Sequence, residues 1–86
     1  MNASIEISYY PLHDYYISPI KDFIYRLNQY DEIEVITNGM STQVFGEFDQ
    51  LMSIVSNEIK KSFELPHSVF ILKIVNADLN HKDGSR

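Results

Sequence analysis

Apolar and polar residues alternate along residues 3–10, a stretch that reads ASIEISYY. Ile5, Ile7 and Tyr9 fall on one face, and the other face carries two serines and a glutamate. A period of two is typical of a strand that packs one face against a core and exposes the other. The sequence therefore predicts a half-buried strand over these residues.

The pattern changes to that of a helix after Ser18 and Pro19. Serine is a favoured N-cap, and proline is favoured at the first helical position. Apolar residues then recur at helical spacing, at Ile20, Phe23, Ile24 and Leu27. We therefore expect a helix that has Ser18 as its N-cap and ends near Asn28.

A hairpin is predicted within residues 33–48. Asn38 and Gly39 both tolerate a positive φ, so together they favour a two-residue type I′ turn. In that register Thr37 lies opposite Met40. The face expected to point to the core then carries Ile33, Val35, Met40 and Val44.

A second helix and a final strand follow the hairpin. Asp49 is a suitable N-cap for the helix. Its apolar stripe consists of Leu51, Met52, Val55, Ile59 and Phe63. Residues 68–76 are apolar on both faces and predict a fourth strand. We expect a single domain over residues 1–77 and a flexible polar tail over residues 78–86.

The order strand, helix, strand, strand, helix, strand is that of the ferredoxin-like βαββαβ fold. This α+β architecture has a four-stranded antiparallel sheet with two helices on one face. Five apolar residues point to the opposite, open face: Ile36, Phe45, Val69, Ile71 and Val75. Because exposed apolar patches are usually covered, we expect a homodimer or homotetramer formed through the open face of the sheet.

Composition and charge narrow the classes of partner. The 86 residues carry a net charge of −5 with only seven basic residues, which disfavours nucleic acids and anionic membranes. No apolar run approaches the roughly 20 residues of a membrane span, and no signal peptide is visible. The sequence has no cysteine, which excludes disulfides and is consistent with a cytoplasmic location.

The predicted topology gathers aromatic and polar residues at one end of the sheet. The segment SYYPLHDYYISPIK, at residues 8–21, lies at the same end as the Asn38–Gly39 turn, because the first two strands run in the same direction. Aromatic rings stack on flat heterocycles, and hydroxyls and carboxylates satisfy ring nitrogens and exocyclic amines. The candidate ligand-binding residues are Tyr9, Asp14, Ser18, Thr37, Asn38, Ser41 and Thr42.

Each candidate also has a purely structural interpretation. Tyr9 faces the core, Asp14 is a residue type common in turns and caps, and Ser18 is the expected N-cap. Met40 fits as a core residue. What favours a binding site is the convergence of these residues on one end of the sheet.

Two segments carry a family resemblance. The run SYYPLHDYYISPIK, followed by MSTQVFGEFDQLM, resembles the single-domain unit of the YkoF-like proteins that bind thiamine and hydroxymethylpyrimidine. The resemblance implies a ferredoxin-like fold, non-catalytic binding of the pyrimidine moiety of thiamine, and assembly through the open face of the sheet. It also implies that Ser41 and Thr42 contact the ligand. Asp14 and Ser18 match the family pattern too, whereas the other three candidates follow from topology alone.

One departure from the family concerns the number of units. YkoF resembles two such units in one chain, whereas this chain has one. Two or four copies of this chain would therefore have to associate to provide the units that YkoF carries within one chain.

We expect no catalytic residues, no metal and no cofactor. The sequence has no cysteine and no serine in a nucleophile-elbow context, and the neighbouring side chains of His13 and Asp14 diverge. His13 and His67 with Asp14 form the candidate metal set, but their spacing matches no metal motif. The expected role is thus non-enzymatic ligand binding in vitamin salvage, transport or sensing. The alternative is a small oligomeric interaction or regulatory module with no functional ligand site.

Overall fold

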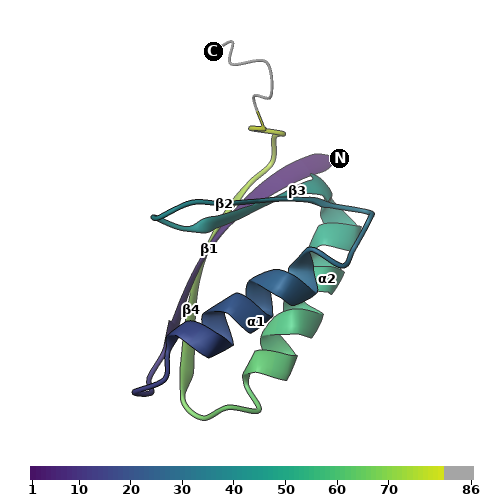
Figure 1. Cartoon of the computed structure of the whole chain (residues 1–86). Helices are drawn as coiled ribbons and strands as arrows, with labels where there is room; N and C mark the ends of the chain where they lie inside the picture. Colours follow the sequence, from purple (N-terminus) through teal and green to yellow (C-terminus); the bar gives the residue numbers. More distant parts are fainter. Residues whose placement is uncertain (81–86) are drawn as a thin grey trace.

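The computed structural model describes residues 1–80 and contains all the expected elements (Figure 1). These are β1 (Asn2–Pro11), α1 (Ile17–Leu27), β2 (Glu34–Thr37), β3 (Thr42–Glu47), α2 (Phe48–Ser62) and β4 (Ser68–Val75). The strands form one antiparallel sheet in the order β2-β3-β1-β4. Both helices lie on the same side of the sheet (Figure 1). The predicted ferredoxin-like α+β fold is therefore confirmed.

The core lies between the sheet and the two helices. Ile5 and Ile7 of β1 are buried and Tyr9 is half-buried, as the alternation predicts. Other buried apolar residues come from both layers: Ala3, Phe23, Leu27, Ile33, Val44, Leu51, Ile54 and Val55. Each large side chain of this set contributes about 1.5–3 kcal/mol by leaving water. This packing fixes the helices against the sheet and so positions the residues at its end.

Helix α1 begins before the predicted N-cap. Tyr16 occupies the N-cap position, its backbone already has helical dihedral angles, and no side chain in the described part of the chain caps this end. The amide of Ile20 donates to the Tyr16 carbonyl at 3.4 Å, so the first turn forms upstream of Ser18. Ser18 thus lies inside the helix, and its predicted N-cap role is wrong.

Helix α2 is capped by Glu47 and not by Asp49. The Glu47 carboxylate accepts a hydrogen bond from the amide of Gln50 at 3.0 Å. Hydrogen bonds from the amides of Gln50 and Asp49 hold the pKa of the Glu47 carboxyl below its usual value. Since β3 runs directly into the helix, Asp49 falls within the first turn, where its charge favours the helix dipole.

The β2–β3 hairpin has a longer connection than the predicted two-residue turn. Thr37 pairs with Thr42, so residues 38–41 form the connection. The register differs from the prediction by two residues, which leaves each strand residue on its predicted face. Met40 now lies in the connection and is 89% exposed, so its predicted core position is wrong.

The side chain of Asn38 explains the longer connection. Its Oδ1 accepts hydrogen bonds from the amides of Met40 at 2.8 Å and Ser41 at 3.2 Å. The backbone N–H of Asn38 donates to the Ser41 carbonyl at 3.2 Å. Asn38 does not adopt the positive φ that a type I′ turn requires. The asparagine side chain therefore closes a wider loop in place of the tight backbone turn.

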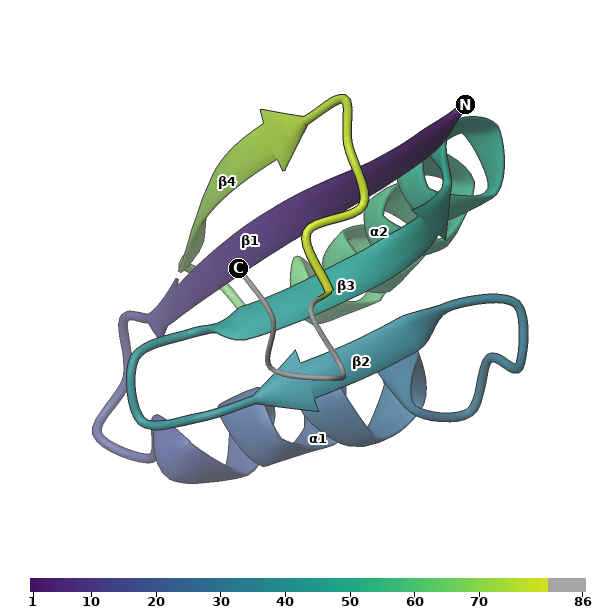
Figure 2. The same ribbon diagram turned by 90° about the horizontal axis from the view of Figure 1, so that it is seen from above.

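The open face of the sheet is apolar, as predicted, with one covered position. Ile36, Val69, Ile71 and Val75 are exposed on it, whereas Phe45 is only 6% exposed. After β4 the chain turns back and crosses over β1 and β3 on this face (Figure 2). We call this segment, residues 76–80, the C-terminal strap.

Three hydrogen bonds hold the C-terminal strap to the sheet. The Ser4 hydroxyl donates to the Ala77 carbonyl at 2.7 Å and accepts from the Leu79 amide at 2.9 Å. The Asn80 side chain donates to the Glu34 carboxylate at 2.7 Å. Leu79 and Asn80, which belong to the predicted tail, thus contact the sheet. Residues 81–86 lie outside the described residues, so their flexibility stays a prediction.

Candidate functional site

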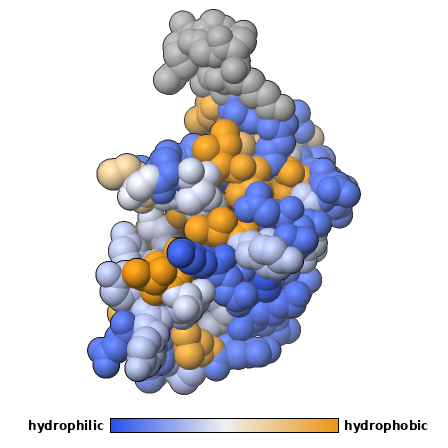
Figure 3. All heavy atoms as spheres, viewed as in Figure 1, coloured by the Kyte–Doolittle hydropathy of each residue, from blue (hydrophilic) through white to orange (hydrophobic). Residues whose placement is uncertain are grey.

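A cavity of about 250 Å³ lies at the end of the sheet where the hairpin meets α1. Its walls come from the end of β1, the 38–41 connection and the first half of α1, and apolar surface is visible between the hairpin and the helix (Figure 3). Five of the seven predicted ligand-binding residues line it: Tyr9, Thr37, Asn38, Ser41 and Thr42. We call it the mouth cavity.

The mouth cavity contains a pair of threonine hydroxyls. The Oγ1 atoms of Thr37 and Thr42 lie 3.2 Å apart and share one hydrogen bond. Each hydroxyl has one donor and two acceptor positions, so the pair keeps one donor and several acceptors unused. Thr42 is buried and Thr37 is exposed. The pair can therefore both donate to and accept from a polar ligand edge.

Ser41 links the mouth cavity to the open face of the sheet. Its hydroxyl donates to the Glu6 carboxylate at 2.9 Å and accepts from the Gln43 side chain at 3.4 Å. Glu6 also pairs with Lys73 across the sheet, with 3.5 Å between the carboxylate oxygen and the ammonium nitrogen. The position of the 38–41 connection thus depends on polar groups of β1 and β4.

Tyr9 belongs to an aromatic cluster as well as to the cavity wall. Its ring stacks on Phe70 with 4.1 Å between centroids and meets the edge of Phe23 at 5.6 Å. The Tyr9 hydroxyl lies 3.2 Å from the Ser68 hydroxyl. Both interpretations from the sequence therefore apply, since the ring packs in the core and also faces the cavity.

The remaining predicted residues lie elsewhere. Asp14 is exposed and lines neither the mouth cavity nor the groove described below. Tyr15 and Tyr16 of the same segment are exposed too and line neither space. Ser18 lies in the first turn of α1, on the side away from the mouth cavity. The Nε2 atom of His13 is buried and has no hydrogen-bond partner among residues 1–80.

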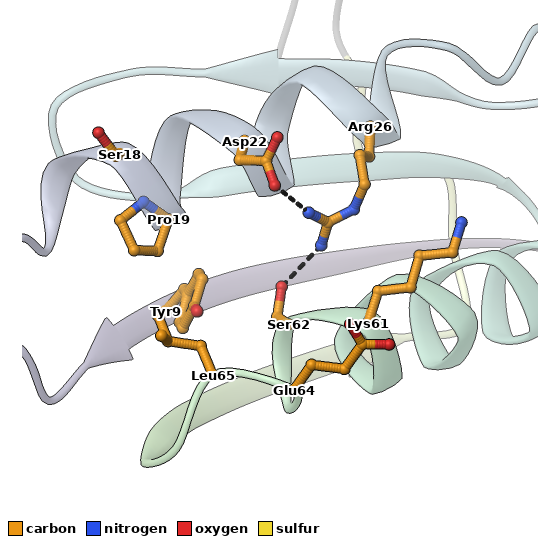
Figure 4. Close-up of a pocket in the computed structure, with 9 residues that line it drawn as sticks. All are labelled: Tyr9, Ser18, Pro19, Asp22, Arg26, Lys61, Ser62, Glu64 and Leu65. Carbon is orange, nitrogen blue, oxygen red and sulfur yellow. Dashed lines mark hydrogen bonds and ion pairs between the residues drawn. The ribbon is translucent and has the colours of Figure 1, made fainter.

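A second cavity of about 540 Å³ lies between the two helices (Figure 4). It is lined by Tyr9, Ser18, Pro19, Asp22, Arg26, Lys61, Ser62, Glu64 and Leu65. Tyr9 lies between the helices, and the hydrogen bond from Arg26 to Ser62, at 2.7 Å, spans the space between them (Figure 4). We call this cavity the interhelical groove.

A buried carboxylate lies beside the interhelical groove. The Glu58 side chain is 1% exposed and accepts hydrogen bonds from Arg26 Nε at 2.7 Å and from the Tyr30 hydroxyl at 2.6 Å. Lys61 Nζ approaches it to 3.3 Å. Burial raises the pKa of the Glu58 carboxyl, but the hydrogen bonds from Tyr30, Arg26 and Lys61 outweigh burial and leave the pKa below its usual value. The carboxylate is thus held in its charged form.

The hydrogen bond to Glu58 also affects Tyr30. Together with burial, it raises the pKa of the Tyr30 hydroxyl above the ordinary 10.0. Glu58 was not among the residues predicted from the sequence. Its spacing from Leu51 and Val55 gives a signal, because position 58 continues the buried stripe of α2.

Within residues 1–80, no group of three or more His, Asp and Glu side chains is placed to hold a metal ion. In the same part of the chain, no helix is long and apolar enough to cross a membrane.

Comparison with known proteins gives structural relatives only. No protein-family model matches the chain, and no curated protein matches it. Protein SP2199 of Streptococcus pneumoniae has a similar structure, with a TM-score of 0.83 and 26% identity over 96% of this chain and 94% of that one. A domain of unknown function, DUF77, from Bacillus cereus has a TM-score of 0.70 at 16% identity, over 92% and 79% of the two chains.

One relative carries a functional description. A Thermotoga maritima protein proposed to act in thiamine biosynthesis or salvage, TM0486, has a TM-score of 0.81 and 18% identity. The match covers 90% of this chain and 85% of that protein. At this identity the likeness shows a shared fold. This chain and TM0486 therefore have the same ferredoxin-like fold.

Proposed function

We propose that the mouth cavity binds the hydroxymethylpyrimidine moiety of thiamine, or a related planar heterocycle, without catalysis. The observation that carries the proposal is the convergence of Tyr9 and the hairpin residues 37–42 on one cavity, although they are distant in the sequence. The family resemblance and the thiamine-related structural relative support the same ligand class.

The size of the mouth cavity favours a single ring. Pockets for drug-sized ligands have volumes of about 300–1,000 Å³, and the mouth cavity is smaller at about 250 Å³. A pyrimidine suits this volume better than complete thiamine does. In the proposed complex the thiazolium half of thiamine projects towards solvent.

The chemistry of the lining suits an aminopyrimidine. Ile20, Phe23 and Ile24 of α1 offer apolar contact for the ring faces. The Thr37 and Thr42 hydroxyls can pair with an exocyclic amine and a ring nitrogen. The lining provides hydroxyls, backbone groups and apolar walls, which suit recognition, so we assign no reaction to the site. Asp14 and Ser18 stand outside the cavity, and we assign ligand contact to the five predicted residues that line it.

We further propose that the chain acts as a homodimer or homotetramer in the cytoplasm, in vitamin salvage, transport or sensing. The exposed Ile36, Val69, Ile71 and Val75 support association through the open face. The same apolar face favours the second candidate function, an interaction or regulatory module with no ligand. Ligand-dependent stability separates the two candidates.

A thermal unfolding screen tests the ligand proposal. Thiamine, its phosphates and hydroxymethylpyrimidine should be tested against the full chain. A ligand at one hundred times its Kd stabilises the folded state by about 2.7 kcal/mol. That gain corresponds to a rise in Tm of roughly 10 °C or more for a domain of this size. No shift with any of these compounds would favour the interaction module.

Substitution of Thr42 tests the location of the site. Thr42→Val keeps the shape of the side chain and removes the hydroxyl, so hydroxymethylpyrimidine should bind about fivefold more weakly, as expected for one hydrogen bond. Thr42→Ser keeps the hydroxyl and serves as the matched control. Equal affinity of the wild type and Thr42→Val would place the ligand elsewhere.

A further inference from the structure

The two cationic side chains of the interhelical groove, Arg26 and Lys61, already pair with groups of the protein. Arg26 donates to the Glu58 carboxylate, to the Glu58 carbonyl, to Asp22 at 2.6 Å and to Ser62. Lys61 contacts Glu58. An anionic ligand would have to draw these groups away from a carboxylate that is 1% exposed. The groove is therefore poorly suited to phosphates and carboxylates, although it contains an arginine and a lysine.

Two polar groups of the groove remain available. The side chains of Glu64 and Ser18 form no hydrogen bond or ion pair with the residues that the structure describes. Both are exposed, and they come from opposite sides of the groove, Ser18 from α1 and Glu64 from the segment after α2 (Figure 4). Between them, Pro19 and Leu65 provide apolar surface.

We propose that the interhelical groove binds a small organic cation, an ammonium or amidinium group carried on a flat apolar body. The cationic group would pair with the Glu64 carboxylate. The body would lie against Pro19, Leu65 and the ring of Tyr9. Of the charged side chains that line the groove, Asp22, Arg26 and Lys61 are paired with protein groups, whereas Glu64 has no partner among the described residues. The unpaired charge of the groove is therefore negative and favours a cation.

This site is separate from the mouth cavity. Its lining residues on α1 are Ser18, Pro19, Asp22 and Arg26, whereas the mouth cavity uses Ile20, Phe23 and Ile24 of the same helix. Of residues 1–80, Tyr9 alone lines both. The proposal therefore does not depend on the thiamine-related function and can succeed or fail without it.

Three probes with the same ring and different charge test the ligand class. Benzamidine is cationic, benzamide is neutral and benzoate is anionic at neutral pH. Each should be titrated into the full chain while backbone amide resonances are followed by NMR. Benzamidine should shift the amides of Ser18, Glu64 and Leu65 in a saturable way, and benzamide and benzoate should bind these residues more weakly.

Substitution of Glu64 tests the proposed contact. Glu64→Gln should weaken benzamidine binding about threefold to fivefold, as expected for an exposed ion pair. Glu32→Gln removes the same charge outside the groove and should change the affinity little. Thr42→Val, in the mouth cavity, should leave benzamidine binding unchanged. The proposal is overturned if benzoate binds as well as benzamidine, if Glu64→Gln has wild-type affinity, or if benzamidine shifts only residues 37–42.

Discussion

At position 58 a carboxylate occupies a place on the buried stripe of α2 that an apolar residue would normally take. Burying a charge is costly unless partners compensate it, and here Arg26, Tyr30 and Lys61 do so. Arg26 in turn is held by Asp22 and Ser62. The two helices are thus joined by polar contacts beside the interhelical groove, and removing one partner leaves the others uncompensated.

Replacing Glu58 should therefore destabilise the fold. We expect Glu58→Gln to lower the free energy of unfolding by about 3 kcal/mol at neutral pH, because Arg26 then lacks its buried counter-charge. Urea denaturation followed by circular dichroism measures the change. Glu64→Gln, the same substitution at an exposed position, should stay within about 0.5 kcal/mol of the wild type.

The pH dependence of this effect follows from the lowered pKa of Glu58. A carboxyl whose pKa is lower in the folded than in the unfolded state stabilises the fold above its unfolded pKa, near 4.5. The stabilisation is lost as the pH falls through the folded pKa. The difference between wild type and Glu58→Gln should be constant from about pH 7 to about pH 5.5 and shrink at lower pH. A difference that is undiminished at about pH 2 would contradict the proposed role of the carboxylate charge.

Individual residues show where sequence reasoning succeeds and where it does not. Thr37 and Thr42 could be placed at the cavity because they flank a turn whose position in the fold is set by topology. Asp14 could not, because it lies in an irregular connection where no period fixes the direction of a side chain. The cap residues differ from the prediction for a local reason, since helical backbone at Tyr16 moves the start of α1 away from Ser18.

At the scale of elements, the register predicted for the β2–β3 hairpin was wrong, but the side chains assigned to each face of the sheet were correct. The Asn38–Gly39 pair favours a two-residue turn by its intrinsic preference, but the Asn38 side chain bonds to two amides of a longer connection. Local preference alone does not choose between these turns. Because the register differs by an even number of residues, the core face of β3 was still predicted correctly.

The C-terminal strap leads to a prediction about one serine. Ser4→Ala removes a hydroxyl that both donates to Ala77 and accepts from the Leu79 amide. The Leu79 amide should then exchange with solvent about thirtyfold faster, since the two lost hydrogen bonds are worth about 1 kcal/mol each. Hydrogen exchange measured by NMR on the full chain tests this, and amides of β1 and β3 should keep their protection.

A second serine on β1 provides the control for the strap experiment. Ser8 has no side-chain hydrogen bond with the described residues, so Ser8→Ala should leave the exchange of Leu79 unchanged. If Ser4→Ala also left the Leu79 amide protected, then packing of Leu79 and not the serine hydroxyl would hold the strap. Nothing in the alternating pattern of β1 distinguishes Ser4 from Ser8, so the strap could not be predicted from the sequence.

At the scale of the whole molecule, the order of helical and strand periods was sufficient to predict the fold. Topology then explains why the end of β1 and the β2–β3 connection lie at the same end of the sheet (Figure 2). The same topology leaves one face of the sheet without helices. The strap covers Phe45 on that face but leaves Ile71 56% exposed.

The exposed part of the open face should be an interface between copies of the chain. Stable interfaces bury about 800 Å² on each partner, and a carboxylate at the centre of an apolar one would be desolvated without a partner. Ile71→Glu should therefore give a monomer near 10.0 kDa in sedimentation experiments, under conditions where the wild type is a dimer or tetramer. Tyr25→Glu, on the solvent side of α1, is the matched control, because Tyr25 is exposed on the helix layer, and it should keep the wild-type mass. A wild-type chain that sediments as a monomer at high micromolar concentration would show that the strap and the exposed side chains are stable in water without a second copy.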